Sequence, residues 1–204
     1  MTYPCVDPDD FLVNGDGALS PQPYMQWRHV ATNSAASIQK SYNTNGGNQA
    51  EDLLTFQVAW TNQNPISMLV YALLTRGGSD VQTGARTRAF IATYYGQASG
   101  AAPADPAAST LIGRTGSGVD GGTYTSGTTY ARWATTEVRQ AEHSQVIGPF
   151  TTLAPGDTLK TSVRLRWDAD FWETLPYFVA GSAEAQLAVT TGASRLDLYA
   201  IPVL

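Results

Sequence analysis

The residues best suited to chemistry lie in one short acidic and aromatic segment. Asp168, Asp170 and Glu173 stand within six residues of each other, and Trp172 and Tyr177 lie among or just after them. A glycoside hydrolase needs two carboxyl groups, one to protonate the leaving oxygen and one to assist at the sugar carbon. The same residues could instead form a sugar-contacting edge or a structural corner that caps a sheet. We expect the structural corner first, the sugar contact second and the hydrolase last. The candidate ligand or interface contacts are therefore Trp172, Tyr177, Asp168 and Asp170.

The two histidines, His29 and His143, are the candidate general bases. A Ser-His-Asp arrangement needs a histidine that a carboxylate orients beside a nucleophile. Glu142 precedes His143, but neighbouring residues of a strand point to opposite faces, so this pair is poorly placed. The sequence contains no Gly-x-Ser-x-Gly nucleophile elbow. We therefore predict no catalytic residue and no enzymatic activity.

Oxygen ligands for a metal are most concentrated near the N-terminus, at Asp7, Asp9, Asp10 and Asp16. The EF-hand pattern is absent because Phe11 occupies a ligand position. These acids are therefore expected to be solvated turn residues.

The remaining cofactor signals are also weak. Cys5 is the only cysteine, which excludes an intrachain disulfide and a zinc site made of cysteines. The glycines at positions 116, 118, 121 and 122 are not followed by the Lys-Ser/Thr pair of a phosphate-binding loop. The sequence predicts neither a metal nor a cofactor.

Composition narrows the class of partner. Charged residues make up 14% of the chain and hydrophobic residues 43%, with a formal net charge of −5. Nucleic acid is excluded as a partner because phosphate binding needs clustered cations, whereas lysine occurs only as Lys40 and Lys160. The N-terminal segment lacks the basic and apolar regions of a secretory signal, and the apolar run Ile66–Leu74 is too short to cross a bilayer. We expect synthesis in a cytosol and no membrane insertion.

Hydrophobic periodicity predicts strands along most of the chain. Apolar residues alternate with polar ones over 54–60 and 159–167, which places one face of each strand on a core. The segment 68–74 is apolar on both faces, which is typical of a central strand or one pressed against another subunit. No segment shows a sustained amphipathic helix with caps.

The number and spacing of these segments predict a single all-β domain over residues 1–204. About eight or nine strands fit an antiparallel β-sandwich, and a jelly-roll-like arrangement is the first choice. Residues 1–35 are expected to form an N-terminal arm with a hairpin at its Asn-Gly/Asp-Gly turn. The Gly/Ala/Ser-rich stretch 96–127 is expected to be a long loop or contact arm.

Three segments resemble the small virion proteins of tailed bacteriophages that infect actinobacteria, especially minor tail proteins. They are YMQWRHVA at 24–31, NPISMLVYALLTRGG at 64–78 and GPFTTLAPGDTLKTSVRLRW at 148–167. The resemblance implies a virion structural protein that is assembled in the host cytoplasm and located in the virion. It implies other virion proteins as partners, a homo-oligomer with a trimer favoured, and contact with a host cell-surface glycan. It implies no functional residue.

Two other classes stay open from the sequence. A capsid decoration protein or head fibre would have the same fold and composition. A carbohydrate-binding module would use exposed aromatic platforms, for which Trp172, Tyr177, Trp133 and Trp27 are the candidates. Burial separates these classes, because structural aromatics lie inside a sandwich or an interface, whereas sugar platforms are exposed.

Overall fold

The computed structural model describes residues 11–13, 19–21, 28–43, 49–83, 87–118, 136–171 and 186–203. Within these ranges all the regular secondary structure is β-strand. The described residues accordingly contain no helix long and apolar enough to cross a membrane. The all-β prediction is confirmed.

The strands that the structure describes follow one another along the chain with these bounds: β1 (Phe11–Val13), β2 (Leu19–Pro21), β3 (Arg28–Ala35), β4 (Ile38–Asn43), β5 (Gln49–Thr61), β6 (Met68–Arg76), β7 (Ser79–Thr83), β8 (Thr87–Gly100), β9 (Thr110–Gly118), β10 (Thr136–Gln140), β11 (His143–Leu153), β12 (Thr158–Phe171), β13 (Gln186–Thr191) and β14 (Ser194–Pro202).

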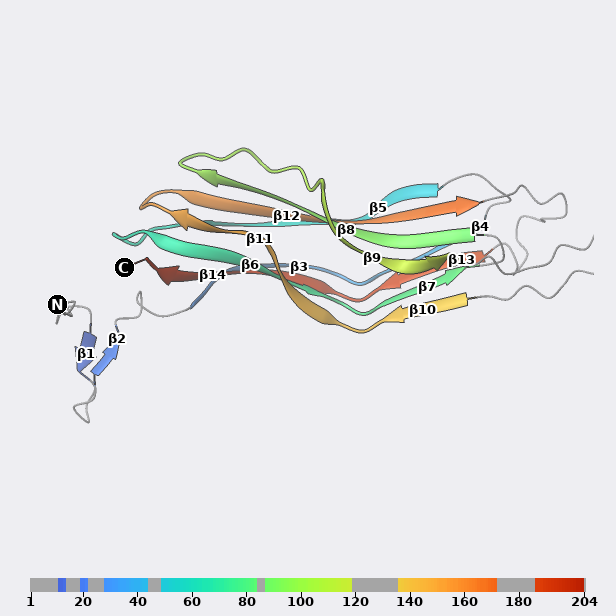
Figure 1. Ribbon diagram of the computed structural model, residues 1–204, viewed down its shortest axis with the longest axis horizontal. Coiled ribbons are helices and arrows are strands. Elements are labelled where there is room, and N and C mark those ends of the chain that lie inside the picture. The colour runs from blue at the N-terminus through green and yellow to red at the C-terminus, as the bar shows by residue number, and fades with distance from the viewer. Residues whose placement is uncertain are drawn as a thin grey trace, which may run out of the picture.

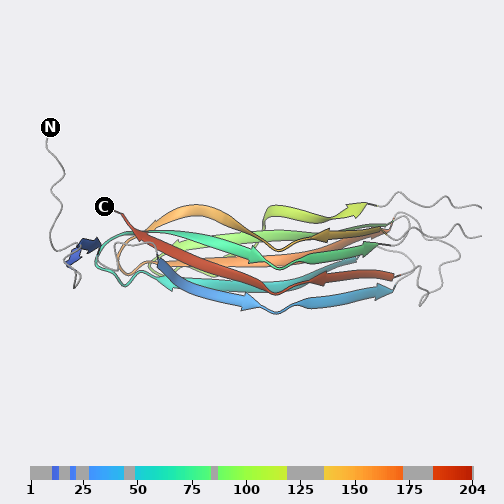
Figure 2. The ribbon, with the colours of Figure 1, turned by 90° about the horizontal axis from the view of Figure 1, so that it is seen from below.

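The first layer consists of four long strands that are each broken once by two residues. The breaks lie at 36–37, 77–78, 141–142 and 192–193. The strand order is β11-β6-β14-β3 on one side of the breaks and β10-β7-β13-β4 on the other. Because the order is the same, the two sheets are halves of one long layer, which bends near its middle (Figures 1 and 2). We call the line of four breaks the seam.

Glycines allow two strands to approach closely at the seam. A Cβ built on Gly77 would lie 2.7 Å from the Cα of Gly192, closer than real Cβ contacts. The N–H of Gly192 donates to the carbonyl of Gly78 at 2.7 Å. Beside them the buried Arg76 donates from Nη2 to Ser79 Oγ at 2.9 Å, and burial lowers the pKa of Arg76 to about 10. A side chain at position 77 is therefore excluded by the neighbouring backbone.

The second layer is a single sheet of order β5-β12-β8-β9. Its strands contain 13, 14, 14 and 9 residues in that order and have no breaks of this kind. The two layers run along the same long axis and pack face to face (Figure 2).

The pairing of the strands identifies the topology. Counting each broken strand once, the described residues of the sandwich form eight strands, from β3/β4 to β13/β14. The first pairs with the eighth, the second with the seventh, the third with the sixth and the fourth with the fifth. This is the pairing of a long hairpin that is rolled into two sheets, which is a jelly roll. The prediction of a jelly-roll-like β-sandwich is confirmed.

Alternate residues of the facing strands fill the core. The fully buried apolar side chains of β6 and β12 are Met68, Val70, Ala72, Leu74, Leu159, Val163, Leu165 and Trp167, each 0% exposed. Burial of a large apolar side chain contributes about 1.5–3 kcal/mol, so this row is a major source of stability. The period-two patterns over 68–74 and 159–167 therefore place the core correctly. The other face of β6 is also apolar and points outward. β6 is an inner strand of its sheet, which is one of the two situations that the two-sided pattern predicted.

The predicted long loop over 96–127 is wrong for two parts of that range. Residues 96–100 complete β8, and 110–118 form β9, which pairs with β8 along the edge of the sheet. The small residues were expected to form a contact arm, whereas the connection 101–109 folds back onto the sheet. Ser162 Oγ donates to the carbonyl of Pro106 at 2.6 Å, and Lys160 Nζ lies 2.8 Å from Asp105 Oδ1. Residues 119–127 lie outside the described residues.

The predicted N-terminal arm over 1–35 also needs a correction. The hairpin is present, because β1 and β2 pair antiparallel as a separate two-stranded sheet. Residues 28–35, however, form β3, the edge strand of the first layer, because they pair with β14. Figure 1 shows the hairpin beyond the end of the sandwich at which β14 ends.

Candidate functional site

The predicted acidic and aromatic site is described only in part. Trp172 and Tyr177 lie outside the described residues. Asp170 lies in β12, opposite Arg88 of β8. Asp168 accepts a hydrogen bond from Arg166 Nε at 2.9 Å, and this partner raises the pKa of Arg166. The Asp168 carboxylate therefore forms an ion pair with Arg166.

His29 forms a pair with a carboxylate that the sequence did not indicate. Its Nε2 lies 3.1 Å from Oδ1 of Asp197, and the side chain of Asp197 is only 3% exposed. Arg195 Nε donates to the other oxygen of Asp197 at 2.7 Å. The described hydrogen bonds of His29 include no serine, threonine or cysteine side chain. The pair thus resembles half of a catalytic triad in geometry, but it lacks a nucleophile among its described partners.

Aromatic rings form a row across the outer face of the first layer. His29, Tyr199, Tyr71 and Phe150 come from β3, β14, β6 and β11, the four strands of one sheet. The centroids of consecutive rings lie 5.4, 5.3 and 5.3 Å apart. Desolvation by burial, followed by the charge of Tyr199, raises the pKa of Tyr71. We call this set the aromatic row.

A β-bulge places the outer end of the row. The register between β11 and β6 shifts between Ile147 and Thr151, so three residues of β11 lie opposite one residue of β6. Gly148 adopts a φ of +72°, which L side chains rarely adopt, and it begins this bulge. Phe150 follows it and is 54% exposed. The bulge therefore presents Phe150 at the edge of the sheet beside Tyr71.

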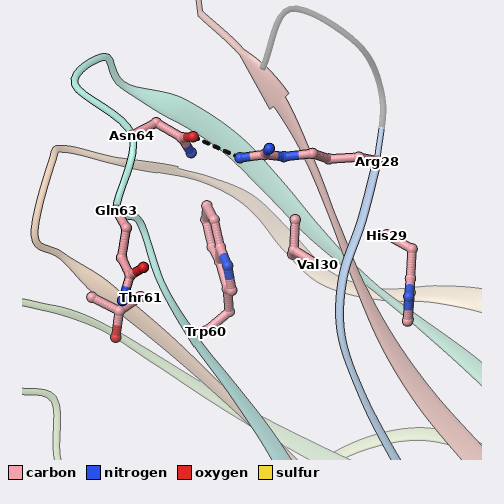
Figure 3. Close-up of a pocket in the computed structure, with 7 residues that line it drawn as sticks. All are labelled: Arg28, His29, Val30, Trp60, Thr61, Gln63 and Asn64. Atoms are coloured by element: carbon pink, nitrogen blue, oxygen red, sulfur yellow. Dashed lines mark hydrogen bonds between the residues drawn. The ribbon is translucent and has the colours of Figure 1, made fainter. Parts of the chain in front are cut away.

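A pocket of about 500 Å³ lies between β3 and β5, which are edge strands of the two layers. Its lining residues are Arg28, His29, Val30, Trp60, Thr61, Gln63 and Asn64. Figure 3 shows the Trp60 indole between Val30 and the side chain of Gln63, with the Arg28 guanidinium above it. His29 points away from the indole, on the other side of β3. The aromatic row and this pocket are therefore separate surfaces that meet at β3.

Hydrogen bonds fix the polar wall of this pocket. Arg28 Nη2 donates to Asn64 Oδ1 at 2.7 Å. Asn64 is held in turn by Asn62, whose Oδ1 accepts from the backbone N–H and the side-chain Nδ2 of Asn64 at 3.0 and 2.9 Å. Asn62 is fully buried and donates to the carbonyls of Ile66 and Leu153 at 2.8 and 3.0 Å. The loop after β5 is thus held by one buried amide side chain.

Other candidate sites have less support. A smaller pocket of about 270 Å³ lies at the opposite edge of the sandwich, between β8 and the bulge of β11. Among the described residues, no group of three or more histidine, cysteine, aspartate and glutamate side chains could hold a metal ion. Asp7, Asp9, Asp10 and Asp16 lie outside these residues, as do the candidate platforms Trp27 and Trp133.

Comparisons with known proteins give a family and two distant structures. A search of curated proteins found no match. Structures of infectious bursal disease virus, strains Gt and Gx, are similar at 12% identity with TM-scores of 0.22 and 0.21. These matches cover 100% of this chain but 45% and 47% of the solved chains, so the chain spans less than half their length. A family model, by contrast, matches residues 1–204, and the chain therefore belongs to the family described as a domain of unknown function, DUF7172.

Proposed function

We propose that the protein is a structural subunit of a tailed-phage virion, of the minor-tail-protein type, that assembles with copies of itself and with neighbouring virion proteins. The assembly part of this proposal is carried by one observation, the apolar outer face that surrounds the aromatic row. The phage part is supported by the resemblance of three sequence segments to minor tail proteins.

The outer face of the first layer has an unusual composition for a solvent-facing sheet. In an antiparallel sandwich the outer positions are normally polar. Here, seven outward-facing apolar side chains lie on β6, β11 and β14. They are Leu69, Tyr71, Leu73, Val146, Phe150, Tyr199 and Ile201. We call this group the apolar face.

Neighbouring strands extend the apolar face, with Thr152 and Asp197 as polar neighbours of Leu69 and Leu73. Leu73 lies opposite Val146, and Ile201 lies opposite Leu69. Val146 and Phe150 are 48% and 54% exposed on the edge strand β11. Single exposed apolar residues are common on proteins, whereas a contiguous group usually marks an interaction surface. Charged groups lie beside the face, at Arg195 and Asp197, as in the polar rim of an interface.

The composition of the chain supports the same proposal. Charged residues form only 14% of the sequence, and charged residues are depleted at the cores of protein interfaces. A second copy of the chain is the proposed occupant of the apolar face. Symmetric homo-oligomers close by repeating such a contact, and a trimer is the expected state.

The first test is the mass of the purified protein by light scattering coupled to size-exclusion chromatography. We expect a closed oligomer for the natural sequence and a monomer for Phe150→Ser combined with Val146→Ser. Leu111→Ser is the matched control, because Leu111 is 44% exposed on β9 of the other layer. A natural chain that is monomeric at every concentration up to its solubility limit would refute self-assembly.

The location in the particle needs a second test. Antibodies against the protein, visualised by electron microscopy on intact phage, should label the tail. Labelling of the head would instead support the capsid decoration or head-fibre class. Absence of the protein from purified particles would rule out both the tail and the head location.

A further inference from the structure

We propose that the pocket between β3 and β5 binds an acidic sugar residue of the hexuronate class. The carboxylate would bind Arg28, and one face of the sugar ring would pack on Trp60. This inference goes beyond the proposed structural role and does not depend on it.

Arg28 is the first reason to expect a negatively charged ligand. Its only side-chain hydrogen bond among the described residues is the one from Nη2 to the neutral amide of Asn64. This contact leaves the positive charge of the guanidinium group without a described carboxylate partner. A carboxylate is the strongest hydrogen-bond acceptor for a guanidinium group.

Four other arginines of the described residues show the contrast, whereas Arg114 lies over the Phe90 ring. Each of four arginines lies within 4 Å of an aspartate oxygen, in the pairs Arg139–Asp80, Arg164–Asp52, Arg166–Asp168 and Arg195–Asp197. Among the described residues Arg28 forms no such ion pair. The pocket therefore contains a guanidinium group whose charge is not matched by a described carboxylate, in a protein whose net charge is −5.

Trp60 supplies the apolar wall that a simple anion site would not need. Its side chain is half-buried at the end of the core face of β5, where it lies beside Val30 (Figure 3). Trp60 lines the pocket as a half-buried indole, and an aromatic ring in a pocket wall favours contact with the C–H groups of a sugar ring. An anion without a ring, such as phosphate, would leave this surface unused.

The remaining lining residues are neutral and able to bind hydroxyl groups. Thr61, Gln63 and Asn64 provide a hydroxyl and two amides around the indole. Ligand pockets generally combine an apolar wall with a few placed polar groups, and a volume of about 500 Å³ is within their usual range. A ligand with several hydroxyl groups, one carboxylate and one apolar face matches this set.

The site is preorganised by the buried amide behind it. Asn62 holds Asn64 through two hydrogen bonds, and Asn64 holds Arg28 through a third. A carboxylate would therefore meet a guanidinium that is already oriented, which reduces the entropy lost on binding.

The test is titration of the full-length protein with sodium D-glucuronate, D-glucose and sodium acetate, followed by ligand-observed NMR. We expect glucuronate to bind at least about tenfold more tightly than glucose or acetate, since a charge-assisted pair is worth about 1.5–3 kcal/mol. Arg28→Gln should reduce glucuronate binding to the level of glucose and leave glucose binding unchanged. Arg139→Gln is the matched control, because the Arg139 side chain is 74% exposed on β10.

Several results would overturn the proposal. Glucuronate that binds no more tightly than glucose would remove the role of Arg28, and acetate that binds as tightly as glucuronate would reduce the site to simple anion binding. Unchanged discrimination in Arg28→Gln, with a circular dichroism spectrum like that of the natural protein, would place binding elsewhere. Glucuronate binding by a monomer would support this site while refuting self-assembly, so the two proposals fail separately.

Discussion

At the scale of single residues, buried polar side chains hold the ends of the strands. Asn62 is 0% exposed and joins the loop after β5 to the loop before β12, because its backbone N–H donates to the carbonyl of Asp157 at 2.8 Å. Its side chain donates to two backbone carbonyls, that of Leu153 in a buried hydrogen bond and that of Ile66 in a partly buried one. No period-two pattern predicts such a residue, since a turn sequence of Thr, Asn and Gln reads as solvated.

Replacement of Asn62 by alanine should therefore be strongly destabilising. The carbonyl of Leu153, in a buried hydrogen bond, and that of Ile66, in a partly buried one, would lose their donor, which costs about 3 kcal/mol in the free energy of unfolding. Asn33→Ala is the matched control, because Asn33 is exposed and its loss should cost about 1 kcal/mol or less. Urea denaturation of both variants measures the difference, and equal losses would contradict the structural role of Asn62.

Tyr71 gives a pH-dependent prediction. Its pKa is raised in the folded protein, so above about pH 10 the folded state retains a proton that the unfolded state loses. The stabilisation is therefore complete below about pH 10 and is lost as the pH rises through the folded pKa. Tyr71→Phe should lose less stability than the natural protein between about pH 9 and about pH 11 in urea denaturation. Parallel curves for the two proteins would show that Tyr71 does not titrate differently on folding.

At the scale of the elements, the seam is the feature that the sequence conceals. Alternation predicts the strand over 68–74, but it does not indicate that the strand resumes as β7 after the break at Gly77 and Gly78. The same applies to β9, whose small residues show no apolar face although they pair along β8. Apolar side chains in the sequence indicate which strands face a core. They do not indicate an edge strand such as β9, which is held mainly by backbone hydrogen bonds.

The seam predicts a position-specific effect of alanine. Gly77→Ala would place a methyl group against the backbone of Gly192, which cannot move as a flexible side chain would, so we expect a loss of about 2 kcal/mol. Gly113→Ala is the matched control, because a Cβ on Gly113 meets no atom within 4 Å. Thermal unfolding of the two variants should separate them clearly. If the Gly77→Ala protein is as stable as the control, the two strands can move apart at the seam without a loss in the free energy of unfolding.

At the scale of the whole molecule, the sequence predicted the fold class and left the candidate sites undetermined. About eight or nine predicted strands without helices already favour a jelly roll. The pocket could not be predicted, because Arg28 and Trp60 come from different layers and meet only when the layers pack. The acidic segment attracted attention in the sequence because its residues are adjacent, yet Asp168 is paired with Arg166.

Self-assembly through the apolar face predicts that stability depends on protein concentration. An oligomer that binds only folded chains raises the melting temperature as concentration increases. We expect this rise for the natural protein in differential scanning calorimetry and no rise for the Phe150→Ser, Val146→Ser double variant. A melting temperature that is independent of concentration in both proteins would argue against the proposed contact.

The rolled topology also has a consequence for synthesis on the ribosome. β13 and β14 occupy an inner position of the first layer, between β3/β4 on one side and β6/β7 on the other. Until residues 186–202 have emerged, the earlier strands of that layer cannot form one continuous sheet, and the apolar side chains that face β14 remain open to solvent. Such late, non-local closure slows folding and favours aggregation of nascent chains. Truncation before residue 186 should therefore yield insoluble protein, whereas an extension after Pro202 should leave the closed sheet intact.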